Sequence, residues 1–165
     1  MRFDVQQGAD ILRRTPSVLD ALLRDVDESW ARNNEGPDTF SPFDVVGHLI
    51  DGDETDWIPR ARIILAGGPN PTFEPYDRFR HRARNAGRSL ASLRDEFAGL
   101  RQDSLELLAS WRLTPAQLSL RANHPGLGPV TRMGLEPGRG EVIPVGGRGR
   151  PVVRDAQAAA GEVVA

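Results

Sequence analysis

The stretch FSPFDVVGHLIDGDETDW, at residues 40–57, decides the fold. Ser41, Pro42 and Asp44 form the pattern of a helix N-terminus: serine caps the helix, proline fits its first turn, and the acid approximates a capping box. Apolar residues then recur every three or four positions, which predicts an amphipathic helix with one buried face. We expect this helix to span about residues 42–66 and to end at the GGP motif that follows.

Two further helices are predicted around this one. The first covers about residues 9–31 and includes Pro16, where the helix starts or kinks. The second covers about residues 89–111. The connection at residues 67–86 is long enough for a crossover rather than a tight antiparallel return. Each helix carries a bundle-type apolar seam, and the three seams end in Trp30, Trp57 and Trp111.

The chain changes character after residue 131. Residues 132–165 are rich in glycine, proline and arginine, and they contain no aromatic residue and no histidine. Such a composition is typical of a disordered tail, and it predicts no long helix at residues 132–153. We therefore divide the chain into an incomplete helical domain at residues 1–131 and a tail at residues 132–165. Two origins of the tail stay open: a shifted reading frame, or a genuine alternative C-terminus.

Composition excludes several classes of function. The chain has no cysteine, which excludes disulfides, a thiolate nucleophile and a cysteine zinc site. A formal net charge of −2 gives no general attraction to nucleic acid or to anionic membranes. No apolar run approaches the roughly 20 residues of a membrane span, and the N-terminus lacks the apolar core of a signal peptide. We expect a cytoplasmic protein with neither a membrane nor nucleic acid as its partner.

Several motifs together carry a resemblance to a known family. They are RTPSVLDALL, FSPFDVVGHLIDGDETDWIPRARIIL, FEPYDRFRH, SLASLRDEFAGLR and LTPAQL followed by NHPGLGPVT. Residues 12–131, which contain them, resemble the DinB-like family of four-helix bundles, also grouped with YfiT-like metalloenzymes. The resemblance implies an all-α bundle, of which three helices are clear here. It also implies a bacterial metal-dependent enzyme, with some members being transferases for low-molecular-weight thiols.

In that family a histidine on the second helix and an HxxxH pair on the fourth bind a divalent metal. His48 matches the first ligand, and nothing in this chain matches the pair. A complete family site would hold zinc or nickel. Because two of the three ligands that the resemblance implies are missing, we expect His48 to be a remnant ligand, no metal cofactor to be bound, and the transferase or hydrolase activity to be weak or lost. His124 is a second candidate ligand, with a structural turn at His124-Pro125 as the alternative.

The remaining polar residues have simpler interpretations. The helical wheel places His48 on the flank of its helix, and periodicity alone predicts a residue that forms a hydrogen bond to a neighbour. Asp53 lies within the apolar stripe, and a buried carboxylate needs a partner. We predict an ion pair with Arg60 or with an arginine of the first helix. His81, within RFRHRAR, is predicted to lie in a solvated basic patch.

Three hypotheses on function therefore stay open. The chain is a metalloenzyme scaffold that has lost activity. Alternatively, it is a non-enzymatic bundle that works as a binding or dimerisation module, because a missing fourth helix leaves an apolar groove through which a homodimer could form. A third hypothesis is RNA binding through the GGRGR segment at residues 146–150.

Overall fold

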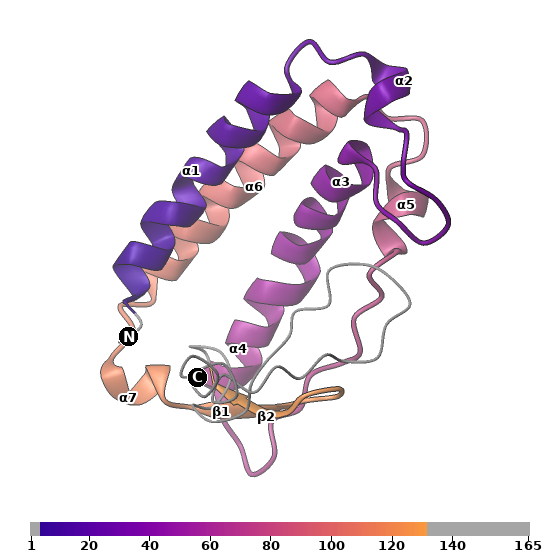
Figure 1. Ribbon diagram of the computed structural model, residues 1–165. Helices are drawn as coiled ribbons and strands as arrows, with labels where there is room; N and C mark the ends of the chain where they lie inside the picture. Colours follow the sequence, from indigo (N-terminus) through magenta and orange to yellow (C-terminus); the bar gives the residue numbers. More distant parts are fainter. Residues whose placement is uncertain (1–3, 132–165) are drawn as a thin grey trace, which may run out of the picture.

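The computed structural model describes residues 4–131, which form a helical bundle with a small β-hairpin at one end (Figure 1). The prediction of an essentially helical fold is confirmed. In chain order the elements are α1 (Val5–Leu23), α2 (Glu28–Ala31), α3 (Pro42–Gly52), the π-helical turn η1 (Asp53–Trp57), α4 (Ile58–Ala66), α5 (Arg80–Arg84), α6 (Leu90–Ser110), α7 (Pro115–Leu118), β1 (Arg121–His124) and β2 (Gly128–Thr131).

The first helix differs from the predicted range of about 9–31. Asp4 caps α1 by accepting hydrogen bonds from backbone N–H groups of the first turn, so the helix begins earlier than expected. It ends before Asp25, whose φ of 59° lies in the left-handed region that stops a helix. The predicted last turn is a separate short helix, α2, with Asp27 as its cap. Pro16 lies inside α1 and does not start it.

The predicted N-terminus of the second helix is confirmed. The Ser41 hydroxyl accepts from the Asp44 backbone N–H at 3.1 Å, and the Asp44 carboxylate accepts from the Ser41 N–H at the same distance. The helix then runs through α3, η1 and α4. A π-helical turn holds more residues than an α-helical turn, so it rotates everything that follows around the helix axis. Trp57 therefore leaves the predicted apolar seam and is 62% exposed.

The main core lies where α3 crosses α6. Its buried apolar residues are Ala31, Phe43, Val46, Ile50, Leu90, Leu93 and Phe97. Leu19 and Leu23 of α1 pack against this cluster, and α1 lies along the other side of α6 (Figure 1). Trp30, predicted to end the first seam, is 58% exposed, because α2 breaks away from the line of α1.

A second, smaller core holds the hairpin against the end of α4. Ile64, Phe73, Ala122 and Val130 are its buried members. The strands β1 and β2 are antiparallel, and the long connection joins them where the Phe73 N–H donates to the Asn123 carbonyl at 3.0 Å. The chain after α7 thus forms a two-stranded hairpin. The predicted tail at residues 132–165 lies outside the described residues.

Candidate functional site

His48 projects from the middle of α3 into a cluster of rings. The centroid of its ring lies 5.3 Å from that of Phe40, and 5.6 Å from those of both Tyr76 and His81. The imidazole is half-buried in this cluster. Burial lowers the pKa of His48 below its ordinary value, and the nearby His81 and Arg78 lower it further. His48 is therefore a neutral imidazole near pH 7.

Asp51, one turn further along α3, anchors the connection to the bundle. Its carboxylate is 1% exposed and accepts hydrogen bonds from Arg80, from Nε at 3.0 Å and from Nη2 at 2.7 Å. The Tyr76 hydroxyl donates to the other carboxylate oxygen at 2.8 Å and also lies 3.3 Å from His48 Nδ1. Burial, followed by the hydrogen bond to Asp51, raises the pKa of Tyr76, so the phenol keeps its proton. A continuous polar chain thus joins Arg80, Asp51, Tyr76 and His48.

The prediction that His81 lies in a solvated patch is wrong. His81 is 0% exposed, packed edge-on against Phe40 with ring centroids 5.2 Å apart. The reason is the close approach of α5 to α3 at Gly47. A Cβ built at Gly47 would lie 2.5 Å from Asn85 Nδ2 and 3.2 Å from a carbon of the His81 ring. The neighbouring arginines of α5 remain on the exposed side, which is the basic patch that the sequence indicated.

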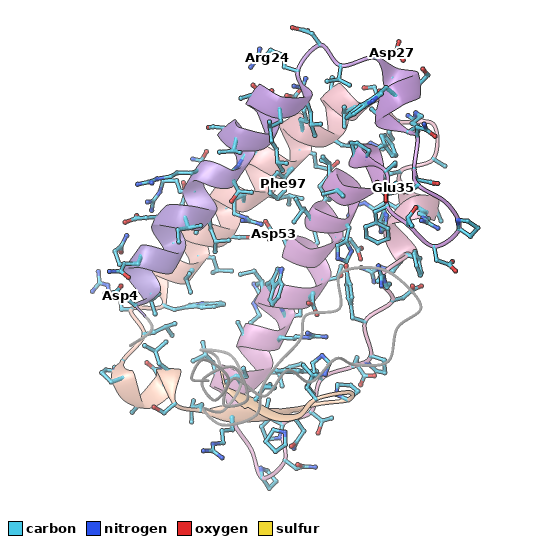
Figure 2. All side chains as sticks on the ribbon, in the orientation of Figure 1. Asp4, Arg24, Asp27, Glu35, Asp53 and Phe97 are labelled. Carbon is cyan, nitrogen blue, oxygen red and sulfur yellow. The ribbon has the colours of Figure 1, made fainter. Side chains whose placement is uncertain are left out.

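Three carboxylates along the continuous helix of α3 and η1, those of Asp51, Asp53 and Asp56, each face a different partner. Asp51 accepts hydrogen bonds from Arg80 and Tyr76 of the connection, as described above. Asp53 accepts two hydrogen bonds from Arg101 of α6, at 2.7 and 3.0 Å, and both side chains are about as buried as the core (Figure 2). Asp56 pairs with Arg60 at 2.6 Å. The prediction that Asp53 forms an ion pair with an arginine is confirmed, but the partner is Arg101 of α6 rather than Arg60 or an arginine of the first helix. The π-helical turn rotates the later carboxylate toward Arg60 and leaves Asp53 facing α6.

His124 is the last residue of β1, where the hairpin turn begins. Its Nδ1 accepts a hydrogen bond from the Gly126 N–H at 3.1 Å, and its ring packs on Phe73 with centroids 6.3 Å apart. Burial raises the pKa of Asp56, whereas the charges of Arg60 and His124 oppose that rise. His124 thus lies on the Asp56 side of α4. Its role as a metal ligand stays a prediction.

The donor groups do not fit the family's metal site. The whole chain has three histidines. His48 lies against both Tyr76 and His81, His81 also lies 3.5 Å from Asp44, and His124 accepts a hydrogen bond from Gly126. The carboxylates on α3 and η1 are each committed to an arginine. Within residues 4–131, no three histidine or acidic side chains gather in a way that could hold a metal ion. A catalytic zinc site takes about three protein ligands and an open position.

An apolar groove opens on the other side of η1. It has a volume of about 490 Å³ and lies between α1, α4 and the C-terminal half of α6. Leu12, Leu105, Leu108, Trp57 and Trp111 line it, and the Asp53–Arg101 pair forms its polar floor. Leu12 is 41% exposed and Trp57 62%. The Asp53–Arg101 pair is thus set in a lining that is mostly apolar.

Sequence reasoning missed the partners that matter most here. Tyr76, Arg80 and Arg101 were not singled out, because each is far in sequence from the residue it contacts. A usable signal existed for Tyr76, the only tyrosine in the chain, which lies in the FEPYDRFRH motif. Arg101 is a basic residue on the apolar stripe of α6, which is the complement expected for the buried Asp53.

Comparisons with known proteins agree with the helical-bundle fold. The family model described as the DinB superfamily matches residues 11–135. A solved structure with a similar fold is YfiT from Bacillus subtilis, described as a probable metal-dependent hydrolase with an unusual four-helix bundle topology. It shares 19% identity at a TM-score of 0.62, over 78% of this chain and 73% of that one. A search among curated proteins finds no match. None of the helices between residues 4 and 131 is long and apolar enough to cross a membrane.

Proposed function

Since the chain belongs to the DinB superfamily, we propose that it keeps the family scaffold without a complete metal-dependent site, and acts as a binding module that associates with a second copy of itself. The description of YfiT as a probable metal-dependent hydrolase suggests what a complete site would do. Here the donor groups support the loss of that activity, whether hydrolase or transferase. A cytoplasmic location remains our expectation, and RNA binding remains a prediction about residues outside the described part.

The apolar groove is the observation that carries this proposal. It is bounded by α1, α4 and α6, so three helices surround a space whose walls are apolar. The similar solved structure is a four-helix bundle, and a groove between three helices of such a bundle accepts a further helix. Apolar surface of this kind favours association over exposure to water.

The exposed side of α1 makes a second copy the best occupant. Ile11, Val18 and Leu22 are 68%, 54% and 67% exposed, and α1 has no buried residue. With Thr15 between them, these residues are spaced by four, three and four, which is the seam of a helix that packs in a bundle. A small ligand in the groove would leave this seam exposed. A partner helix covers both, and α1 of a second copy carries a suitable apolar seam.

The first test measures oligomeric state by light scattering after size exclusion, over a range of concentrations. We expect a dimer for the wild type and a monomer for the double variant Val18→Glu/Leu22→Glu, because two buried carboxylates would oppose the interface. Ser17→Glu/Ala21→Glu is the matched control, since both residues are exposed on α1 outside the seam. A wild-type protein that stays monomeric at all concentrations would overturn the proposal that the chain associates with a second copy of itself.

The second test measures whether the purified protein contains a bound metal ion. Purified protein should contain no stoichiometric zinc or nickel, and a chelator should leave the melting temperature unchanged, because a ligand bound only to the native state must stabilise it. About one metal ion per chain that disappears in His48→Ala would restore the enzyme hypothesis. His124→Ala would then be the next variant, since His124 is the other predicted ligand.

A further inference from the structure

We infer that Asp51 and Tyr76 are positioning residues that hold His48 with its proton on Nδ1 and the lone pair of Nε2 available to accept a proton or a hydrogen bond. This site lies on the side of α3 that faces the connection, whereas the groove lies beyond η1. The inference therefore stands whether or not the chain dimerises.

The hydrogen bonds of Tyr76 lead to this assignment. A phenol has one proton to donate. Asp51 receives it, because its oxygen lies 2.8 Å from the hydroxyl and Arg80 donates twice to the same carboxylate. The hydroxyl oxygen can then only accept from His48 Nδ1, which lies 3.3 Å away. Nδ1 must consequently carry a hydrogen.

The environment of the imidazole completes the assignment. In a neutral imidazole one ring nitrogen carries the hydrogen and the other has a free lone pair, so the hydrogen that the Tyr76 geometry places on Nδ1 leaves Nε2 without one. Nε2 is then an acceptor. No residue between 4 and 131 donates a hydrogen bond to it. The aromatic rings of Phe40 and Tyr76 restrict the imidazole, so the acceptor has a set direction.

This arrangement suits a small molecule with a weakly acidic X–H group, such as an alcohol, a thiol or water. A carboxylate that acts on an imidazole through a hydrogen bond fixes its tautomer and raises its basicity, which is how oriented histidines work as proton acceptors. Here the effect of Asp51 is transmitted through the Tyr76 hydroxyl. Neither Asp51 nor Tyr76 needs to touch the ligand.

The test is long-range ¹H–¹⁵N NMR of the full chain labelled in histidine, which reports the tautomer of each ring. The resonances of His48 are identified by their loss in His48→Gln. We expect wild-type His48 to show a protonated Nδ1 and an unprotonated Nε2 at pH above its pKa. A protonated Nε2 in the wild type would overturn the inference outright.

Two variants make the test specific. In Asp51→Asn the amide oxygen should face Arg80 and the amide nitrogen should donate to Tyr76, so the hydroxyl proton turns to His48 and moves the ring proton to Nε2. In Tyr76→Phe the constraint is removed, and the Nδ1 preference should disappear. Asp77→Asn is the control, because Asp77 neighbours Tyr76 but caps the Phe79 N–H. An unchanged His48 tautomer in Tyr76→Phe would contradict the role of the hydroxyl even if Asp51→Asn fails to fold.

Discussion

At one end of the bundle α3 and α6 meet through apolar side chains, whereas further along the same helix line η1 joins α6 through a buried ion pair beside an open groove. Phe97 and Asp53 mark the two regions in Figure 2. At the apolar end the side chains of the core are buried. The groove end contains apolar residues that remain exposed, such as Leu12 and Trp57. The comparison teaches that two different interactions hold α6 against the same helix line, apolar packing at one end and a buried ion pair further along.

The largest effect on stability is expected from a substitution in the core of the apolar end, where α3 packs on α6. Phe97→Ala should cost about 3–5 kcal/mol of unfolding free energy, because it removes a fully buried ring and leaves a cavity. Trp57→Ala, on the rim of the groove, should change stability by only about 0.5 kcal/mol, since that side chain is mostly exposed. Urea unfolding at a concentration where the protein is monomeric measures both. Equal losses would show that the two ends are packed alike.

The next effect tests the ion pair. Asp53→Asn leaves the Arg101 guanidinium buried without a counter-charge, which should cost about 3 kcal/mol, the lower end of the usual range, because the groove admits water. Replacing both partners, as Asp53→Leu/Arg101→Met, should recover most of this loss. Asp10→Asn breaks an exposed pair with Arg13 and should cost less than about 1 kcal/mol. A double variant less stable than Asp53→Asn would mean that the pair itself stabilises the fold.

The smallest effect concerns pH and His48. Its folded-state pKa lies below the ordinary value of 6.5, so the unfolded chain binds a proton first as the pH falls. The stability that neutral His48 contributes is therefore complete above about pH 6.5 and decreases as the pH falls below it. His48→Gln should have a flatter profile between pH 7 and 5 in the same urea experiment. Because burial is the main cause, the difference should persist at high salt, and parallel profiles would contradict it.

The features that could be predicted correctly from the sequence depend on residues that are close together in the chain. Ser41 with Asp44, Ser89 and Thr114 each cap a helix as their sequence pattern indicates, because a cap involves residues only two or three positions apart. The apolar spacing of α3 and α6 identified core residues such as Val46 and Leu93. The hairpin has no clear signal in the sequence, since its two strands have only four residues each and are too short to show alternation.

The errors share a different cause. Trp57 was assigned to the core because an ideal helical period was continued through residues 53–57, where the backbone is π-helical. His81 was assigned to solvent because its neighbours are arginines, and only the contact of α5 with Gly47 of α3 buries it. In both cases the deciding contact comes from packing between elements, which the local pattern does not contain.

By itself, the sequence determined the helical class, the caps, the position of His48 on its helix and the absence of a histidine pair to join it. Those properties depend on residue type and short spacing. Only the tertiary structure decided that Asp51 meets Tyr76, that Asp53 meets Arg101, and that three helices leave a groove between them. Such partners are 25 and 48 residues apart. Their pairing follows from how the connection and α6 pack on α3 and η1, because a buried carboxylate takes whichever donor the fold brings to it.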